Sequence, residues 1–132
     1  PATVPLAGLT VLAVDNEPAI VDGMRVLVGS WGCALHTAGS LSEALALVLG
    51  GALRPDVIVA DYHLDHGTGL DLIVSLRAAL AADIPAVLLT ADRSPDVRDA
   101  AAAQRVQVLN KPLKPASLRA LLTQWRGRQA AE

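Results

Sequence analysis

Five short apolar segments alternate along the chain with five segments of helical periodicity, and this alternation restricts the fold more than any other feature. The strand-like segments are residues 9–14, 34–38, 57–60, 85–90 and 106–110. Apolar runs of this length are typical of strands that are buried on both faces. Parallel strands need crossover connections, and helices in those connections cover both faces of the sheet. The sequence therefore predicts an α/β fold with a doubly wound, five-stranded parallel sheet.

The helical segments carry start signals at their first residues. Pro18, Pro95 and Pro115 suit the first position of a helix, and Asn16 and Ser40 are natural caps. Apolar residues at helical spacing predict one buried face for each helix. In chain order these faces contain Ile20, Met24, Leu27, Val28 and Trp31, then Leu41, Ala44, Leu45 and Val48, then Leu70, Ile73, Val74 and Leu80, then Val97, and finally Leu118, Leu121, Leu122 and Trp125.

Length and composition indicate one domain. With 132 residues, 52% of them hydrophobic and 18% charged, the chain can bury a single aliphatic core and is not disordered. We expect a linker at residues 1–8, the domain at 9–127 and a polar tail at 128–132, with the last helix ending at Gly127. A start without methionine suggests a domain cut from a longer chain.

Charge and cysteine content bear on partners and compartment. The formal net charge of −2 gives no electrostatic reason to expect nucleic acid or an anionic membrane as a partner. The single cysteine, Cys33, permits no internal disulfide and suits a reducing compartment. No apolar run approaches the roughly 18 residues that cross a bilayer. We therefore expect a cytoplasmic domain without direct membrane contact, although a longer parent chain could carry an anchor.

Chemically active side chains stand at the ends of four predicted strands. Asp15 follows the first strand, Asp61 follows the third, Thr90 ends the fourth and Lys111 follows the fifth. In a doubly wound sheet the first and third strands are neighbours where the strand order reverses, and ligands bind in the crevice at that point. We therefore expect Asp15 and Asp61 to lie close together.

Such a pair of carboxylates has a limited set of uses. Two adjacent carboxylates repel, so they either retain a proton or bind a cation, and an oxygen-only cluster suits Mg²⁺. Lys111 and the Thr90 hydroxyl would then bind the oxygens of an incoming phosphoryl group. The alternative for Asp61, taken alone, is that it ends a strand or caps the next turn, as aspartate often does.

The loop after Asp61 contains residues that also occur in dinucleotide-binding loops and in transition-metal sites, but the sequence favours neither. Gly67 and Gly69 permit tight turns, but a dinucleotide-binding loop would follow the first strand, where this chain has acids. His63 and His66 flank the predicted pocket, yet no cysteine or further histidine completes a transition-metal set. We interpret both histidines as exposed loop residues.

Together these residues resemble a known family. From about Leu9 to Trp125 the chain resembles a response-regulator receiver domain, the phosphoacceptor module of bacterial two-component signalling. The resemblance rests on residues 14–17 (Val-Asp-Asn-Glu), Asp61, Gly69, Thr90-Ala91 and Lys111-Pro112, which fall in register across the five-fold alternation. It implies a flavodoxin-like (βα)5 fold with strand order 2-1-3-4-5.

The resemblance also implies a chemistry. Asp61 would accept a phosphoryl group from a phosphohistidine, and Asp15, Asp61 and the main-chain carbonyl of His63 would hold Mg²⁺. Thr90 and Lys111 would contact the phosphoryl oxygens. The domain would catalyse only its own phosphorylation and dephosphorylation, and its partner would be a histidine kinase or a histidine phosphotransfer domain. Further structural implications are a cis peptide before Pro112, a loop glycine at Gly69, a small residue at Ala91 and a homodimer through the fourth and fifth helices.

Two positions depart from the family pattern. Asn16 stands where many receivers have a second aspartate on the metal, and a neutral amide is a weaker ligand for a hard cation, so we expect either a low metal affinity or assistance from Glu17 through water. Val108 stands where many receivers have an aromatic ring that rotates with the threonine. Valine has no such ring, so we expect that form of coupling to be absent.

Several functions remain as alternatives. The leading linker, the loop after Asp61 and the segment around Lys111 are similar to receivers at the carboxyl end of hybrid sensor histidine kinases, and a stand-alone receiver is the next choice. A receiver that has lost its chemistry and serves as a binding module is a third, because of Asn16. A metal-dependent phosphatase would need a second acid two residues after its nucleophile, where this chain has His63. A flavodoxin-like module would bind a cofactor phosphate beside the acids at 15–17, and their negative charge would repel that phosphate, which disfavours this alternative.

Overall fold

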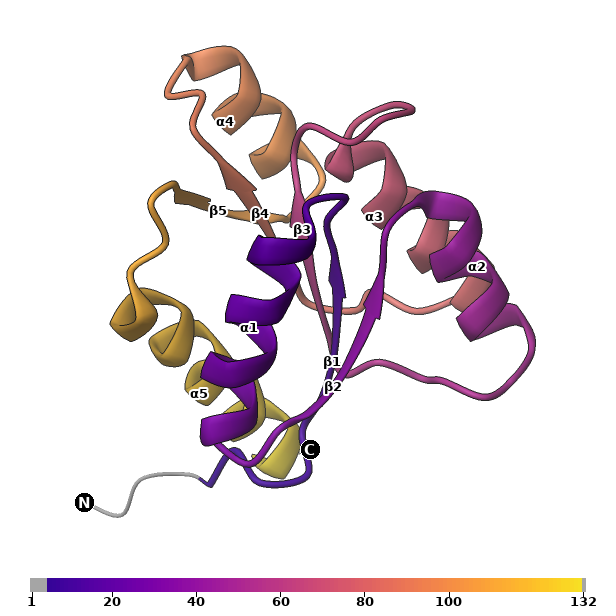
Figure 1. Ribbon diagram of the computed structural model, residues 1–132, viewed down its shortest axis with the longest axis vertical. Helices are drawn as coiled ribbons and strands as arrows, with labels where there is room; N and C mark the ends of the chain where they lie inside the picture. The colour runs from indigo at the N-terminus through magenta and orange to yellow at the C-terminus, as the bar shows by residue number, and fades with distance from the viewer. Residues whose placement is uncertain (1–4, 132) are drawn as a thin grey trace.

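A single parallel sheet with helices on both faces forms the fold (Figure 1). The computed structural model describes residues 5–131, and its strand order is β2-β1-β3-β4-β5. The strands are β1 Thr10–Val14, β2 Ala34–Ala38, β3 Val57–Asp61, β4 Ala86–Thr90 and β5 Gln107–Asn110. The helices are α1 Pro18–Ser30, α2 Leu41–Leu49, α3 Gly69–Leu80, α4 Pro95–Ala103 and α5 Pro115–Ala131. The predicted fold class and strand order are confirmed.

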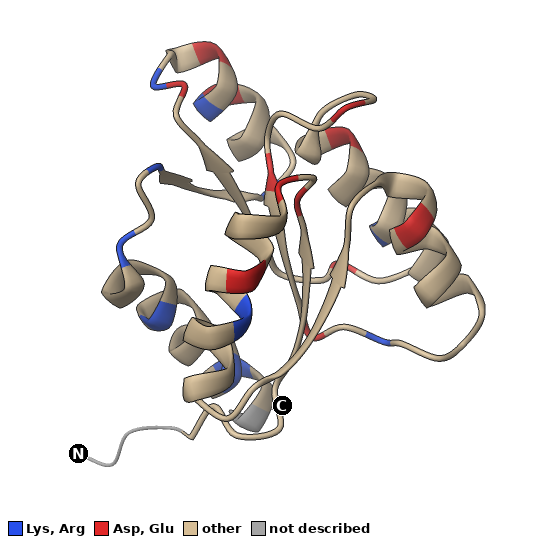
Figure 2. Cartoon of the chain, viewed as in Figure 1, with Lys and Arg blue, Asp and Glu red and all other residues tan. Residues whose placement is uncertain are grey.

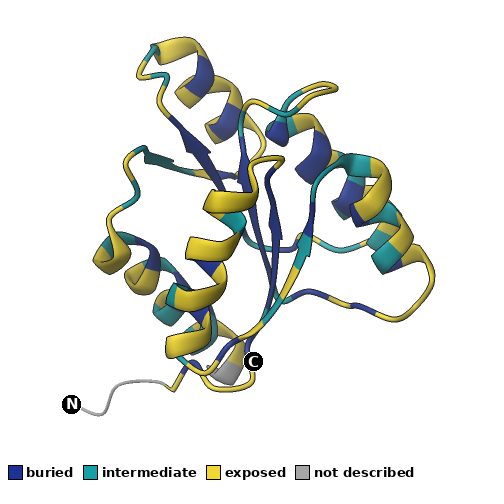
Figure 3. Ribbon diagram, viewed as in Figure 1, coloured by how far each residue is buried: buried dark blue, intermediate teal, exposed yellow. Residues whose placement is uncertain are grey.

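The sheet separates two hydrophobic cores (Figure 3). Leu12 of β1 faces α2, α3 and α4, whereas its neighbour Val11 faces α1 and α5. Ile58 and Val59 of β3 divide in the same way. Because successive strand residues point to opposite faces and both faces are covered, every position of β3 and β4 is buried. Double burial explains why the sequence of these strands is continuously apolar.

The predicted helix faces need two corrections. Val74 is 40% exposed, and the buried face of α3 instead contains Gly69, Leu72, Ile73 and Leu76. The first two turns of α3 are apolar at nearly every position, so the sequence pattern does not determine which side packs on the sheet. Ile20, predicted to be buried, is 37% exposed on α1.

Helix termini also differ in part from expectation. Ser40 caps α2 as predicted, since its hydroxyl accepts a hydrogen bond of 3.2 Å from the Glu43 amide. Asn16 does not cap α1, because Glu17 occupies the cap position without a side-chain hydrogen bond. Gly127 does not end α5, which continues to Ala131. Among the described residues, no helix has both the length and the apolar character that a membrane crossing requires.

The segment predicted as a linker is partly packed. Residues 1–4 lie outside the described part of the chain. Leu6 is buried in the core between the sheet, α1 and α5, and the Gly8 amide donates to the Gly32 carbonyl at 3.0 Å. Arg126 of α5 donates to the Ala7 carbonyl at 3.0 Å. Residues 5–8 therefore belong to the folded unit.

Candidate functional site

The site is formed by residues at or directly after the ends of four strands, at one edge of the sheet. Asp61 is the final residue of β3, and Thr90 is the final residue of β4. Asp15 and Lys111 directly follow β1 and β5. The Lys111 ammonium lies 2.8 Å from Oδ1 of Asp61. Figure 2 shows the acidic segments gathered around this end of β1 and β3. Asp15 and Asp61 line one small hollow, so the structure brings together the two carboxylates and the lysine.

Asp15 is the least satisfied acid at this edge. Its side chain is buried, and Oδ1 accepts a hydrogen bond of 2.9 Å from the Glu17 amide. Within residues 5–131, Oδ2 is buried and has no hydrogen-bond partner. Burial raises the pKa of the Asp15 carboxyl above its ordinary value of 3.8; the Glu17 hydrogen bond opposes this rise, and the charge of Asp61 adds to it. The pocket therefore has unneutralised negative charge.

Lys111 remains charged in this setting. Partial burial alone would lower the pKa of its ammonium. The hydrogen bond and the charge of Asp61 outweigh burial, with further contributions from Asp15 and Glu17, so the pKa of Lys111 is raised above 10.5. One ammonium thus faces two buried carboxylates.

These residues fit a hard divalent cation. A buried carboxylate oxygen without a donor is destabilising by about 1–3 kcal/mol, and a cation at Asp15 and Asp61 would remove that penalty. The His63 carbonyl accepts no backbone hydrogen bond within the described part of the chain. No group of three histidine, cysteine or acidic side chains suited to a metal occurs between residues 5 and 131. The donor set therefore consists mainly of oxygens from two carboxylates, which suits Mg²⁺.

Asn16 makes a contact that the sequence did not predict. Its Nδ2 donates to Oδ1 of Asp65 at 2.6 Å, which joins the loop after β1 to the loop after β3. Asp65 lies 49 positions away in an irregular loop, where no periodicity indicates its partner. Glu17, which we expected to assist the metal through water, is exposed at the N-cap of α1.

Gly69 has a steric role at the site. Its amide donates to the Tyr62 carbonyl at 2.9 Å, and a Cβ at this position would lie 2.1 Å from the main-chain oxygen of Asp61. Only glycine lets the start of α3 approach the end of β3 this closely. The loop between them is closed by a bridge between His63 and Thr68. His63 and His66 are both exposed, as predicted.

The hydroxyl of Thr90 is buried and already engaged. Oγ1 accepts a hydrogen bond of 3.0 Å from the Asp92 amide, and the Thr90 carbonyl accepts one of 2.9 Å from the Lys111 amide. Ala91, the next residue, is exposed. The Lys111-Pro112 peptide is cis, as the family resemblance implied. Val108 is half-buried on the edge strand.

Replacing Asp15 with asparagine is expected to stabilise the metal-free protein at neutral pH by about 1 kcal/mol, because the uncompensated charge disappears while the acceptor for Glu17 remains. The raised pKa means that folded Asp15 holds its proton longer than unfolded Asp15. The stability that protonated Asp15 contributes to the folded state is therefore fully present below pH 3.8. It is lost as the pH rises through the pKa of Asp15 in the folded protein. Urea unfolding in a chelator, at acidic and neutral pH, measures the difference, which should vanish in acid. A variant less stable than wild type at neutral pH contradicts this account.

The chain was compared with known proteins. The model of the family described as response regulator receiver domain matches residues 11–123. The probable transcriptional regulatory protein TcrX of Mycobacterium tuberculosis is 37% identical over 83 residues, which are 63% of this chain and 34% of TcrX. The "uncharacterized 14.6 kDa protein in sodA1 3′ region" of Leptolyngbya boryana is 30% identical over 122 residues, which are 91% of this chain and 92% of that protein.

Solved structures of response regulators have the same fold as this chain. Chemotaxis protein CheY4 of Vibrio cholerae superposes with a TM-score of 0.79 at 28% identity, over 89% of this chain and 98% of CheY4. A two-component response regulator from Clostridium difficile has a TM-score of 0.83 at 20% identity and covers 92% of this chain, which supports the fold alone. The match spans about a third of the length of TcrX. Because the family model matches most of its length, this chain belongs to the response regulator receiver domain family.

Proposed function

We propose that this domain accepts a phosphoryl group on Asp61 from a phosphohistidine of a histidine kinase or a histidine phosphotransfer domain. The observation that carries the proposal is the arrangement of Asp61, which is 4% exposed at a strand end, contacts the Lys111 ammonium at 2.8 Å and lines the same small hollow as Asp15. A buried carboxylate that contacts a lysine ammonium and lies near a second acid suits phosphoryl transfer better than it suits the capping of a turn.

In the proposed step, a carboxylate oxygen of Asp61 forms a bond to phosphorus while the phosphorus–nitrogen bond of the donor breaks. The donor imidazole keeps the electron pair and takes a proton from solvent. Lys111 is placed to offset charge on the phosphoryl oxygens. The Thr90 hydroxyl accepts from the Asp92 amide, so its own proton is available to donate to a phosphoryl oxygen.

The metal ligands in this proposal are Asp15, Asp61 and the His63 carbonyl. Asn16 would add an amide oxygen, and Glu17 would act through water. Bound Mg²⁺ would neutralise charge on the phosphoryl oxygens. The unpartnered Oδ2 of Asp15 is the feature of this chain that most favours a cation here.

An apolar cavity beside Lys111 supports a helical protein as the donor. The cavity has a volume of about 340 Å³ between α1 and the loop after β5, and its apolar wall includes Ile20, Met24, Leu27 and Leu113. Ile20 is 37% exposed, so it adds apolar surface to this wall. An amphipathic donor helix laid in this cavity would bring its phosphohistidine to Asp61.

Parentage is a second part of the proposal. The resemblance to receivers of hybrid sensor histidine kinases supports a longer parent chain, whereas the Leptolyngbya protein, which this chain covers almost completely, supports a stand-alone regulator. The flanking coding sequence decides between the two. We also propose a homodimer through α4 and α5, which light scattering before and after phosphorylation would test.

The decisive experiment is incubation with acetyl phosphate and Mg²⁺ followed by intact mass spectrometry and peptide mapping. The expected result is one phosphoryl adduct at Asp61, absent in Asp61→Asn and in chelator. Asp92→Asn is the matched control, because Asp92 is also an acid beside the pocket but lies after β4. If wild type forms no adduct with acetyl phosphate or a phosphoramidate, the domain is a binding module and the proposal fails.

A further inference from the structure

One hydrogen bond connects Asn16, in the loop after β1, to Asp65, a residue to which the family resemblance gave no role. Asn16 directly follows Asp15, and its amide nitrogen donates to Oδ1 of Asp65 at 2.6 Å. Among the described residues, this is the side-chain hydrogen bond that joins the loops after β1 and β3. Those loops follow the two strands whose ends hold Asp15 and Asp61.

The chemistry of the two partners fixes the direction of the Asn16 amide. An ionised carboxylate accepts hydrogen bonds and donates none, so Asp65 can hold only the NH₂ end of the amide. The oxygen then occupies the other branch of the same planar group. A free asparagine could turn either end toward a cation, since the two ends have nearly the same shape. The NH₂ end would repel Mg²⁺, which binds oxygen.

We propose that Asp65 is a positioning residue for the metal site, which holds Asn16 so that its amide oxygen is the atom offered to the cation at Asp15 and Asp61. This inference rests on the proposed function and adds a residue to its site. A charge-assisted hydrogen bond also draws electron density toward the amide oxygen, which makes that oxygen a better ligand. Asp65 thereby offsets part of what the chain loses by having asparagine instead of aspartate at position 16.

Two other roles for Asp65 predict different behaviour. If Asp65 bound the cation itself, or attracted it through charge, its effect would not depend on Asn16. If Asp65 only tied the loops together, its removal would change stability and leave metal affinity alone. Only the positioning role requires both an acceptor at position 65 and an amide at position 16.

Calorimetric titration of the unphosphorylated protein with Mg²⁺ separates these roles. We expect Asp65→Ala to weaken Mg²⁺ binding about tenfold, the lower end of the range seen when outer-shell partners are removed. Asp65→Asn keeps an acceptor oxygen but can also donate, so it no longer fixes the direction of the Asn16 amide, and we expect a loss of about threefold, smaller than that of Asp65→Ala. In an Asn16→Ala background, Asp65→Ala should cause no further loss. Asp71→Ala is the matched control, because Asp71 is also an exposed acid near this loop and should leave affinity unchanged.

The outcomes are distinguishable from failure of the proposed function. If wild type binds Mg²⁺ and forms the Asp61 adduct but Asp65→Ala binds Mg²⁺ equally well, only the role of Asp65 is overturned. A further loss in the Asn16→Ala background also overturns it. If wild type binds no Mg²⁺ and forms no adduct, the proposed function and this inference fall together. Thermal unfolding of each variant without metal confirms that it is folded.

Discussion

Replacing Lys111 with methionine is expected to slow phosphorylation of Asp61 by acetyl phosphate about a hundredfold to a thousandfold. The ammonium lies 2.8 Å from Asp61, and in the proposed transfer it would offset charge that grows on the phosphoryl oxygens. Loss of one preorganised donor of this kind typically lowers a rate by about that factor. The time course of adduct formation, followed by mass spectrometry in saturating Mg²⁺, measures the effect.

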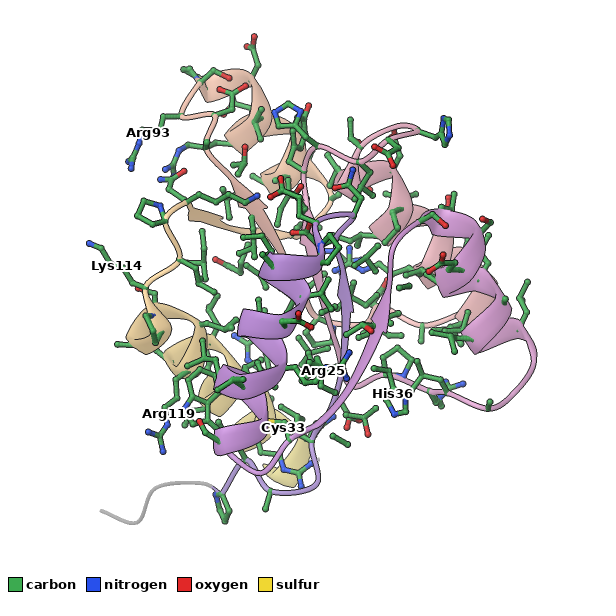
Figure 4. All side chains as sticks on the ribbon, viewed as in Figure 1. Arg25, Cys33, His36, Arg93, Lys114 and Arg119 are labelled. Atoms are coloured by element: carbon green, nitrogen blue, oxygen red, sulfur yellow. The ribbon has the colours of Figure 1, made fainter. Side chains whose placement is uncertain are left out.

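Lys114→Met provides the control for charge. Lys114 is exposed and, as Figure 4 shows, projects away from the body of the molecule on the loop that precedes α5. Both substitutions remove one positive charge, yet only the first should slow the reaction. In the metal-free protein Lys111→Met should also lower the free energy of unfolding by about 1–2 kcal/mol, a discounted value because this lysine side chain is 27% exposed. Equal rates for the two variants would contradict the role given to Lys111.

Replacing Gly69 with alanine is expected to lower the free energy of unfolding by about 3 kcal/mol or more. The added Cβ would lie 2.1 Å from the oxygen and 2.9 Å from the carbon of the Asp61 carbonyl group. Both atoms belong to the main chain of a buried strand, so neither can move aside as a flexible side chain would. Denaturant unfolding measures the loss.

Gly23→Ala is the matched control for this substitution. Gly23 lies in α1, and a Cβ there would meet nothing within 4 Å outside its own helix. Alanine is the better helix former, so the control should stabilise the protein by about 0.5–1 kcal/mol. If Gly69→Ala proved as harmless as Gly23→Ala, the result would contradict the close approach of α3 to the main chain of Asp61.

The strand ends were predictable because two strong physical effects agree there. Burial on both faces makes the strands continuously apolar, so the first polar residue marks each end. Parallel strands then place all their carboxyl ends at one edge, which brings Asp61 to Lys111 from separate parts of the chain. Neither step depends on details of side-chain packing.

Other features depend on information that the sequence pattern does not contain. The buried side of α3 could not be chosen, because Leu70, Leu72, Ile73 and Val74 offer apolar groups in several directions. The bond between Asn16 and Asp65 joins two irregular loops, where no periodicity applies. Gly69 was expected only to help the loop turn, whereas the close approach of the Asp61 carbonyl is a property of the folded backbone.

Under the proposed function, the distribution of the helices over the two faces would place the phosphoryl donor on one side of the sheet and leave the other side open to a downstream partner. The cavity proposed for the donor lies on the side of α1 and α5, while Asp92, which donates to Thr90, leads into α4 on the opposite side. The pocket sits at the rim between them. A donor and a downstream receptor could therefore occupy the molecule at the same time without competing for space.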